Sequence, residues 1–179
     1  MVCDRCKKVL NEELTKIGVE VISMELGKVE VKDSPVVTMA QINKIITANG
    51  FELIEDKEML LVEHIKLFLI SLVDQIPLQR TKKLSTLLAE ELNKDYSGLS
   101  KLFSRNEHIT IEKFFIRLKL EKVKEWIQEG QHSFSEIAHL LDYTNSSHLS
   151  KQFKEATGLS MTEYKKSNRW LRRPLDKII

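Results

Sequence analysis

The chain has 179 residues, enough for one large domain or two small ones, and its 42% hydrophobic and 30% charged residues are typical of an ordinary soluble globular protein. Its most apolar stretch, residues 67–73, is far shorter than the ~20 residues needed to cross a bilayer, and the chain begins without a signal-peptide pattern. We therefore expect a cytoplasmic protein with no membrane partner.

The charge is unevenly divided along the chain. Residues 1–56 hold 7 Lys/Arg and 10 Asp/Glu, a net charge of −3, whereas residues 57–179 hold 21 and 16, a net charge of +5. The basic C-terminal part is compatible with binding to phosphate groups. It does not require such binding, because basic faces are often only solvated.

Residues 1–56 alternate between helical and strand patterns. Apolar residues at helical spacing are followed by two short segments in which valines alternate with charged residues, and Gly27 marks the turn between them. A second helix is expected to end at Gly50. The predicted elements are a helix over residues 6–17, strands over residues 19–21 and 29–31, a helix over residues 42–50 and a strand over residues 51–54.

The first six residues, Met-Val-Cys-Asp-Arg-Cys, resemble the Met-x-Cys-x-x-Cys loop of heavy-metal-associated domains. One more strand in front of the predicted elements would complete the βαββαβ order of a ferredoxin-like fold, which this resemblance implies for residues 1–56. In that family the loop follows the first strand. Nothing precedes the loop here, so either a first strand is missing from this sequence or the sheet is made of three strands.

Cys3 and Cys6 have two alternative interpretations. Two thiolates at a loop that leads into a helix can bind a soft ion such as Cu(I), Zn(II) or Cd(II). Alternatively, Cys6 is a small buried residue and Cys3 an exposed thiol, because a single CxxC supplies only two of the four ligands of a closed zinc site. The chain's two cysteines are too few for a disulfide framework.

A helix is predicted over residues 58–75 and ends before Pro77. We expect it to open a second domain, so that the predicted domains are residues 1–56 and 57–167, followed by a basic tail at residues 168–179. The tail includes Arg-Trp-Leu-Arg-Arg-Pro at residues 169–174, which is either a phosphate contact or a frayed terminus.

The sequence pattern of residues 133–158 predicts two helices joined by a tight turn. We name these residues the second helix pair. Ser133 and Glu136 have the spacing of a capping box, Asn145 is a suitable N-cap for the second helix, and Gly158 is a suitable C-terminal cap. The outward positions of the second helix are short, polar or basic, and such side chains can hydrogen-bond base edges or phosphates. Such a helix is suited to lie in a DNA groove.

The chain repeats this pattern at residues 84–108, the first helix pair, where Asp95 is the predicted N-cap. The run Leu-Ser-Lys-Leu-Phe at residues 99–103 recurs 50 residues later as Leu-Ser-Lys-Gln-Phe, and the same offset pairs Phe114 with Tyr164. Upstream the offset is 49, so the turn of the first pair is one residue shorter. A long helix over residues 111–129, with Trp126 expected to serve packing, lies between the two pairs.

These motifs resemble the AraC/XylS transcription regulators over residues 58–167. The resemblance rests on Glu-Ile-Ala at residues 136–138, Leu-Ser-Lys-Gln-Phe-Lys at 149–154 and Thr-Gly-Leu-Ser at 157–160. It implies an all-α domain with two helix-turn-helix units. The chain departs from the family pattern at residues 142–143, where Asp-Tyr replaces Gly-Phe, at Met161, which replaces Pro, and at His108, which replaces Gly.

The family resemblance and the outward positions together give the candidate DNA-binding residues: Ser97, Ser100, Lys101, Ser146, Ser147, His148, Ser150, Lys151 and Lys154. Each serine is alternatively an ordinary surface residue, and His148 either reads a base edge or only covers its helix. Lys101 and Lys151 occupy the same place in both pairs, which favours a functional role in phosphate contact.

We interpret the chain as a sequence-specific regulator of transcription that inserts two recognition helices into successive major-groove segments of double-stranded DNA and works with the transcription machinery. The competing hypothesis is a soft-metal-binding or thiol redox-sensing protein that acts through the N-terminal CxxC. An enzyme is not expected, because the sequence has no nucleophile elbow, phosphate loop, HExxH helix or paired-carboxylate motif.

Overall fold

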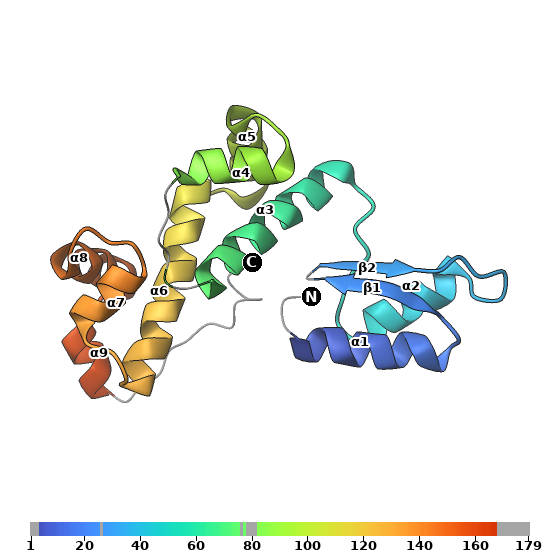
Figure 1. Ribbon diagram of the computed structural model, residues 1–179, viewed down its shortest axis with the longest axis horizontal. Coiled ribbons are helices and arrows are strands. Elements are labelled where there is room, and N and C mark those ends of the chain that lie inside the picture. The colour runs from blue at the N-terminus through green and yellow to red at the C-terminus, as the bar shows by residue number, and fades with distance from the viewer. Residues whose placement is uncertain (1–3, 26, 76, 78–81, 168–179) are drawn as a thin grey trace. The chain divides into compact units, whose positions relative to one another are not determined.

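The computed structural model describes residues 4–25, 27–75, 77 and 82–167 (Figure 1). The chain divides into two compact units, Met1–Leu67 and Phe68–Ile179. The domain boundary predicted between residues 56 and 57 stays a prediction. No helix among the described residues is long and apolar enough to cross a membrane.

The first unit pairs a β-hairpin with two helices. Its elements are α1 (Asp4–Lys16), β1 (Val21–Glu25), β2 (Lys28–Val31) and α2 (Met39–Ala48). The strands are antiparallel, with Val21 opposite Val31 and Glu25 opposite Lys28, and Gly27 has the positive φ of 72° that the predicted turn needs. Leu10, Leu14 and Val19 form the buried core of this unit.

The strand predicted over residues 51–54 is wrong. Gly50 adopts a φ of 76°, and the Phe51 backbone N–H donates to the Ile46 carbonyl at 3.0 Å, which closes the end of α2. The Phe51 side chain is half-buried against the core, but its backbone does not join a strand ladder. The described residues of this unit thus contain two strands, and the predicted ferredoxin-like sheet is not confirmed.

The second unit is helical. Helix α3 (Lys57–Asp74) matches the predicted helix within one residue at each end and contributes residues to both units. The remaining helices are α4 (Leu84–Leu92), α5 (Tyr96–Glu107), α6 (Ile111–Glu129), α7 (Phe134–Leu140), α8 (Ser146–Thr157) and α9 (Met161–Ser167). Helix α6 runs between the two helix pairs, with α4 and α5 toward one end and α7, α8 and α9 toward the other (Figure 1).

The two helix pairs have equivalent turns, as the sequence repeat predicts. Asn93 and Asp142 both adopt left-handed backbone conformations, with φ values of 48° and 57°. In each turn the next backbone N–H donates back to an alanine carbonyl: Lys94 to Ala89 at 3.2 Å, and Tyr143 to Ala138 at 2.9 Å. Counted from these left-handed residues, two residues precede α5 and three precede α8, which confirms the predicted difference of one residue.

The ends of the second helices are also equivalent. Asp95 and Asn145 cap α5 and α8 through their side chains, as predicted, and His108 and Gly158 end these helices with φ values of 57° and 78°. Behind each helix two aromatic rings meet edge to face with centroids 5.4 Å apart, Phe103 with Phe114 and Phe153 with Tyr164. The predicted capping box of Ser133 and Glu136 at the start of α7 is confirmed.

Candidate nucleic-acid interface

Each of α5 and α8 anchors one face in the core and exposes the other. Leu99 and Phe103 of α5 are fully buried, as are Leu149 and Phe153 of α8. Because residues four apart share one side of a helix, the exposed positions form a matched row on each helix. The row is Ser97, Lys101 and Arg105 on α5, and Ser147, Lys151 and Glu155 on α8.

Three of the six positions in these rows are basic, and one, Glu155, is acidic. Lys101 and Lys151 are both exposed at the same place, and Lys154 adds an exposed cation on α8. Arg105, which is not among the residues predicted from the sequence, is exposed one turn after Lys101, where α8 carries Glu155. A comparison of the whole recognition helices at the offset of 50 residues would have identified Arg105.

Three of the candidate serines lie at the edge of these faces. Ser100, Ser146 and Ser150 are half-buried, and the Ser150 hydroxyl donates to the Met161 sulfur of α9 at 3.5 Å. They therefore offer less accessible surface than Ser97 and Ser147. Their predicted contact with DNA stays a prediction.

The two helices differ in the charge at their first turn. On α5 the Asp95 carboxylate accepts hydrogen bonds from the Ser97 hydroxyl and, at 3.2 Å, from the Gly98 backbone N–H. These bonds, that of Ser97 foremost, lower the pKa of Asp95, so a negative charge stands beside this helix N-terminus. On α8 the uncharged Asn145 accepts from the His148 backbone N–H at 2.8 Å. The start of α8 is thus the more favourable of the two for a phosphate group.

Tyr96, in the first turn of α5, is half-buried and links α5 to α6. Its hydroxyl donates to the Glu112 carboxylate in the first turn of α6. This bond lowers the pKa of Glu112, and burial together with the same bond raises the pKa of Tyr96. Tyr96 therefore fixes the packing of α5 on α6.

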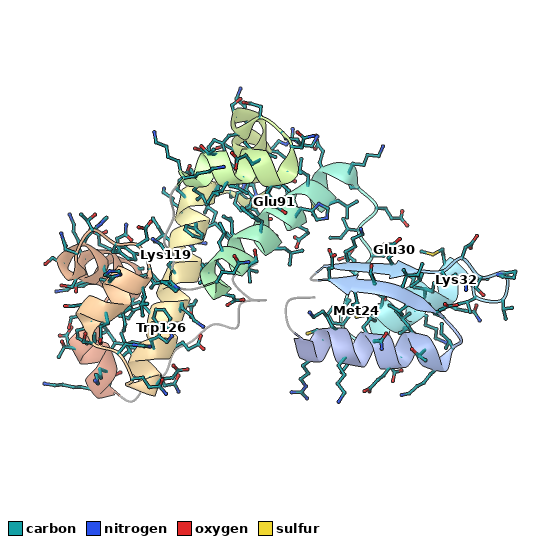
Figure 2. The ribbon with its side chains drawn as sticks, in the orientation of Figure 1. Met24, Glu30, Lys32, Glu91, Lys119 and Trp126 are labelled. Carbon is teal, nitrogen blue, oxygen red and sulfur yellow. The ribbon has the colours of Figure 1, made fainter. Side chains whose placement is uncertain are left out.

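A second set of contacts connects α6 to the exposed face of α8. Lys119 is only 6% exposed, and its Nζ atom lies 4.0 Å from the centroid of the Tyr143 ring and 3.5 Å from the Leu141 carbonyl oxygen. Figure 2 shows Lys119 on the side of α6 that faces α7 and α8. The Tyr143 hydroxyl donates to Gln152 Oε1 at 2.9 Å, and burial raises the pKa of Tyr143 to about 12.

His148 lies at the outer end of these contacts. Its ring meets the Tyr143 ring edge to face, with centroids 5.5 Å apart, and its Nε2 atom is 3.5 Å from Gln152 Nε2. His148 is among the DNA-binding residues predicted from the sequence, whereas Lys119, Tyr143 and Gln152 are not. The available signal was the tyrosine that replaces the phenylalanine usual in the family.

Trp126 serves packing, as predicted, since it is 8% exposed and its ring meets His132 edge to face at 5.3 Å (Figure 2). The basic tail, expected to be either a phosphate contact or a frayed terminus, lies outside the described residues.

The metal site predicted at Cys3 and Cys6 is only half within the described residues. Cys6 is half-buried on α1, and Cys3 lies outside the described part of the chain. Among the residues that the structure describes, no group of three or more His, Cys, Asp or Glu side chains could hold a metal ion. Binding of Cu(I) or Zn(II) by these cysteines stays a prediction.

Comparisons with known proteins agree with the geometry of the second unit. Residues 88–167 match a family described as "Helix-turn-helix domain". The raffinose operon transcriptional regulatory protein RafR of Pediococcus pentosaceus is 32% identical over 80 residues, which are 45% of this chain and 29% of that protein. The chain thus covers less than a third of this relative's length.

A solved structure shares the helical arrangement of the second unit. The C-terminal domain of AraT, a response regulator from Geobacillus stearothermophilus, aligns with a TM-score of 0.54 and 20% identity over 63% of this chain and 89% of that one. A DNA-binding transcriptional dual regulator from Escherichia coli K-12 aligns with a TM-score of 0.49 and 18% identity over 57% and 90% of the two chains. Residues 88–167 therefore match a helix-turn-helix domain in sequence, and the AraT domain shares their helical fold.

Proposed function

We propose that this chain is a sequence-specific DNA-binding regulator of transcription, in which α5 and α8 enter successive segments of the major groove on one face of the duplex. The observation that carries the proposal is the pair Lys101 and Lys151, exposed at the same place on two equivalent helices of a helix-turn-helix domain. Groove segments on one face of B-DNA recur about every 34 Å, and α6 is the element that would set the distance between the two helices.

The relatives' names support the assignment to transcription. RafR is named a transcriptional regulatory protein and AraT a response regulator. The proposal extends the regulation of transcription from RafR to this chain. It rests on the matched domain alone, because the chain covers only 29% of RafR.

The side chains of the interface favour phosphate contact over direct base readout. A lysine that neutralises a phosphate releases a counterion, so affinity falls as salt rises. Ser97 and Ser147 are small, and a discrimination of about 1–3 kcal/mol is reached only by a good bidentate pair. Lys101, Lys151 and Lys154 would therefore supply most of the affinity.

Selection from random duplexes, followed by titration of the chosen sequence over a range of salt concentrations, tests this function. Lys101→Ala and Lys151→Ala should each weaken binding to all sequences and reduce the salt slope by about one unit. Lys44→Ala removes an exposed lysine of α2 in the first unit and serves as the matched control with an unchanged slope. Selection that enriches no sequence, or a Lys151→Ala slope equal to that of the wild type, would refute the proposal.

A further inference from the structure

The imidazole of His148 is exposed, yet two other side chains of the second helix pair hold it in place. The Tyr143 ring meets it edge to face at 5.5 Å, and the Gln152 amide nitrogen lies 3.5 Å from its Nε2 atom. Gln152 follows His148 by four residues, so both side chains share one side of α8. An exposed side chain that is held from two sides is oriented before any partner arrives.

The contacts between these side chains have a direction. The Tyr143 hydroxyl donates to Gln152 Oε1 at 2.9 Å, which leaves the amide nitrogen of Gln152 on the side of His148. With the Gln152 amide in this orientation, its nitrogen donates and His148 Nε2 accepts with its lone pair. A neutral imidazole carries one proton, and that proton must then be on Nδ1.

Tyr143 is itself fixed from inside the domain. The buried ammonium of Lys119 lies 4.0 Å from the centroid of its ring, within the range of a cation–π contact. The same ammonium is 3.5 Å from the carbonyl oxygen of Leu141, the residue that ends α7. The phenol is therefore held by α6 and by the turn before its hydroxyl reaches Gln152.

The first helix pair has no counterpart to these contacts. At the positions that match Tyr143, His148 and Gln152 it has Lys94, Gly98 and Leu102. Gly98 has no side chain, and a Cβ placed on it would meet nothing within 4 Å. The arrangement is thus a property of the second pair and not of the repeated scaffold.

We propose that Tyr143 and Gln152 are positioning residues that hold His148 in its Nδ1–H form, so that α8 offers a hydrogen-bond donor to an acceptor on a base edge. This inference rests on the proposed function for its DNA partner. The major-groove acceptors that such a donor can meet are the N7 and O6 atoms of purines and the O4 atom of thymine. The tautomer itself is a property of the free protein.

Long-range ¹H–¹⁵N correlation spectra of the imidazole groups in the full chain, recorded at about pH 8.5 where histidine side chains are neutral, test the tautomer directly. His148 is assigned by its loss in His148→Ala. We expect a protonated Nδ1 in the wild type and a return to the Nε2–H form that free histidine prefers in both Tyr143→Phe and Gln152→Leu. Gln152→Leu copies the residue of the first pair, and Tyr143→Phe keeps the ring.

Tyr96→Phe is the matched control, because it also removes a hydrogen-bonded tyrosine hydroxyl. Tyr96 belongs to the first helix pair, and its hydroxyl donates to Glu112 of α6. This variant should leave the His148 signals unchanged. A wild-type His148 in the Nε2–H form, or an Nδ1–H form that survives in both variants, overturns the positioning role whether or not the protein binds DNA.

The DNA part is tested on the selected duplex and on single base-pair changes within it. Tyr143→Phe should reduce discrimination at one base pair about five- to tenfold with the salt slope unchanged, and His148→Ala should reduce it at the same base pair. The double variant should lose no more than His148→Ala alone. Unchanged discrimination in Tyr143→Phe overturns the inference, whereas a wild type that binds no duplex overturns the proposed function and leaves the tautomer result standing.

Discussion

Replacement of His108 by glycine should stabilise the second unit, because His108 ends α5 in a conformation that suits glycine better. Its φ of 57° and ψ of 16° lie in the left-handed region, which costs an L-residue about 1–2 kcal/mol. Glycine avoids this cost but loses about 0.5–1 kcal/mol through its greater freedom in the unfolded chain. We therefore expect His108→Gly to raise the free energy of unfolding by about 0.5–1 kcal/mol.

The second helix pair offers the reciprocal experiment. Gly158 occupies the same position with a φ of 78°, and a Cβ built there would meet nothing within 4 Å. Gly158→His should thus lower the free energy of unfolding by about as much as His108→Gly raises it, because only the backbone conformation opposes the new side chain. His108→Ala is the control, since it removes the imidazole and keeps the left-handed strain, and it should change stability by less than about 0.5 kcal/mol.

Urea unfolding followed by intrinsic fluorescence measures these changes, because both tryptophans of the chain lie in residues 68–179. For a chain of this length, 1 kcal/mol corresponds to a shift of the thermal midpoint of roughly 2–4 °C. If His108→Gly left the midpoint unchanged or lowered it while His108→Ala raised it, the imidazole and not the backbone would be the destabilising element. That result would refute the reasoning.

The remaining predictions concern the same unit and use the same fluorescence measurement. Gly98→Ala should stabilise α5 by about 0.5–1 kcal/mol, because Gly98 is helical and open space surrounds its Cα; a loss of stability would mean that the helix start requires glycine. Leu149→Ala should cost about 2–5 kcal/mol because Leu149 is fully buried, and a cost below 1 kcal/mol would contradict its place in the core. Four carboxylates that accept hydrogen bonds at helix starts have a pKa below the ordinary 3.8 or 4.5: Asp95, Glu112, Glu136 and Glu163. These carboxylates contribute their full stabilisation above the ordinary pKa values, and the contribution should be lost as the pH falls through their lower pKa values in the folded state. Burial raises the pKa of Asp74, so protonation of Asp74 on acidification should instead favour the folded state. An unfolding midpoint that does not fall on acidification below pH 4.5 would show that these hydrogen bonds do not stabilise the folded state.

Local chemistry made the helix ends of the second unit predictable from the sequence. Ser133, Asn145 and Gly158 each determine a cap through their own side chain or the lack of one, so identity and spacing sufficed to place them. The two-fold repeat was visible for the same reason, because the buried leucines and phenylalanines recur at one offset. These features need no knowledge of long-range contacts.

Other features could not be predicted from the sequence, because they depend on which of several possible hydrogen-bond partners a polar group meets in the fold. Phe51 has a strand-like sequence context, yet its backbone N–H goes to the Ile46 carbonyl because Gly50 turns the chain back on α2. The Tyr96 hydroxyl meets Glu112 of the next helix, a partner that the sequence does not identify. A periodic pattern states which side a residue occupies and does not state which neighbour its polar atoms meet.

Helices α5 and α8 have equivalent surroundings but differ in the groups that they expose. On α5 the positions that match His148 and Gln152 hold Gly98 and Leu102, so its first turn presents backbone, one serine and the charge of Asp95. On α8 an uncharged cap leaves the helix start favourable to phosphate, and a held imidazole stands beside it. If both helices enter the groove, mutations in α8 should change which sequence is chosen, whereas mutations in α5 should change chiefly how tightly any sequence is bound. In that case the repeated scaffold would divide affinity and specificity between its two copies without any change in fold.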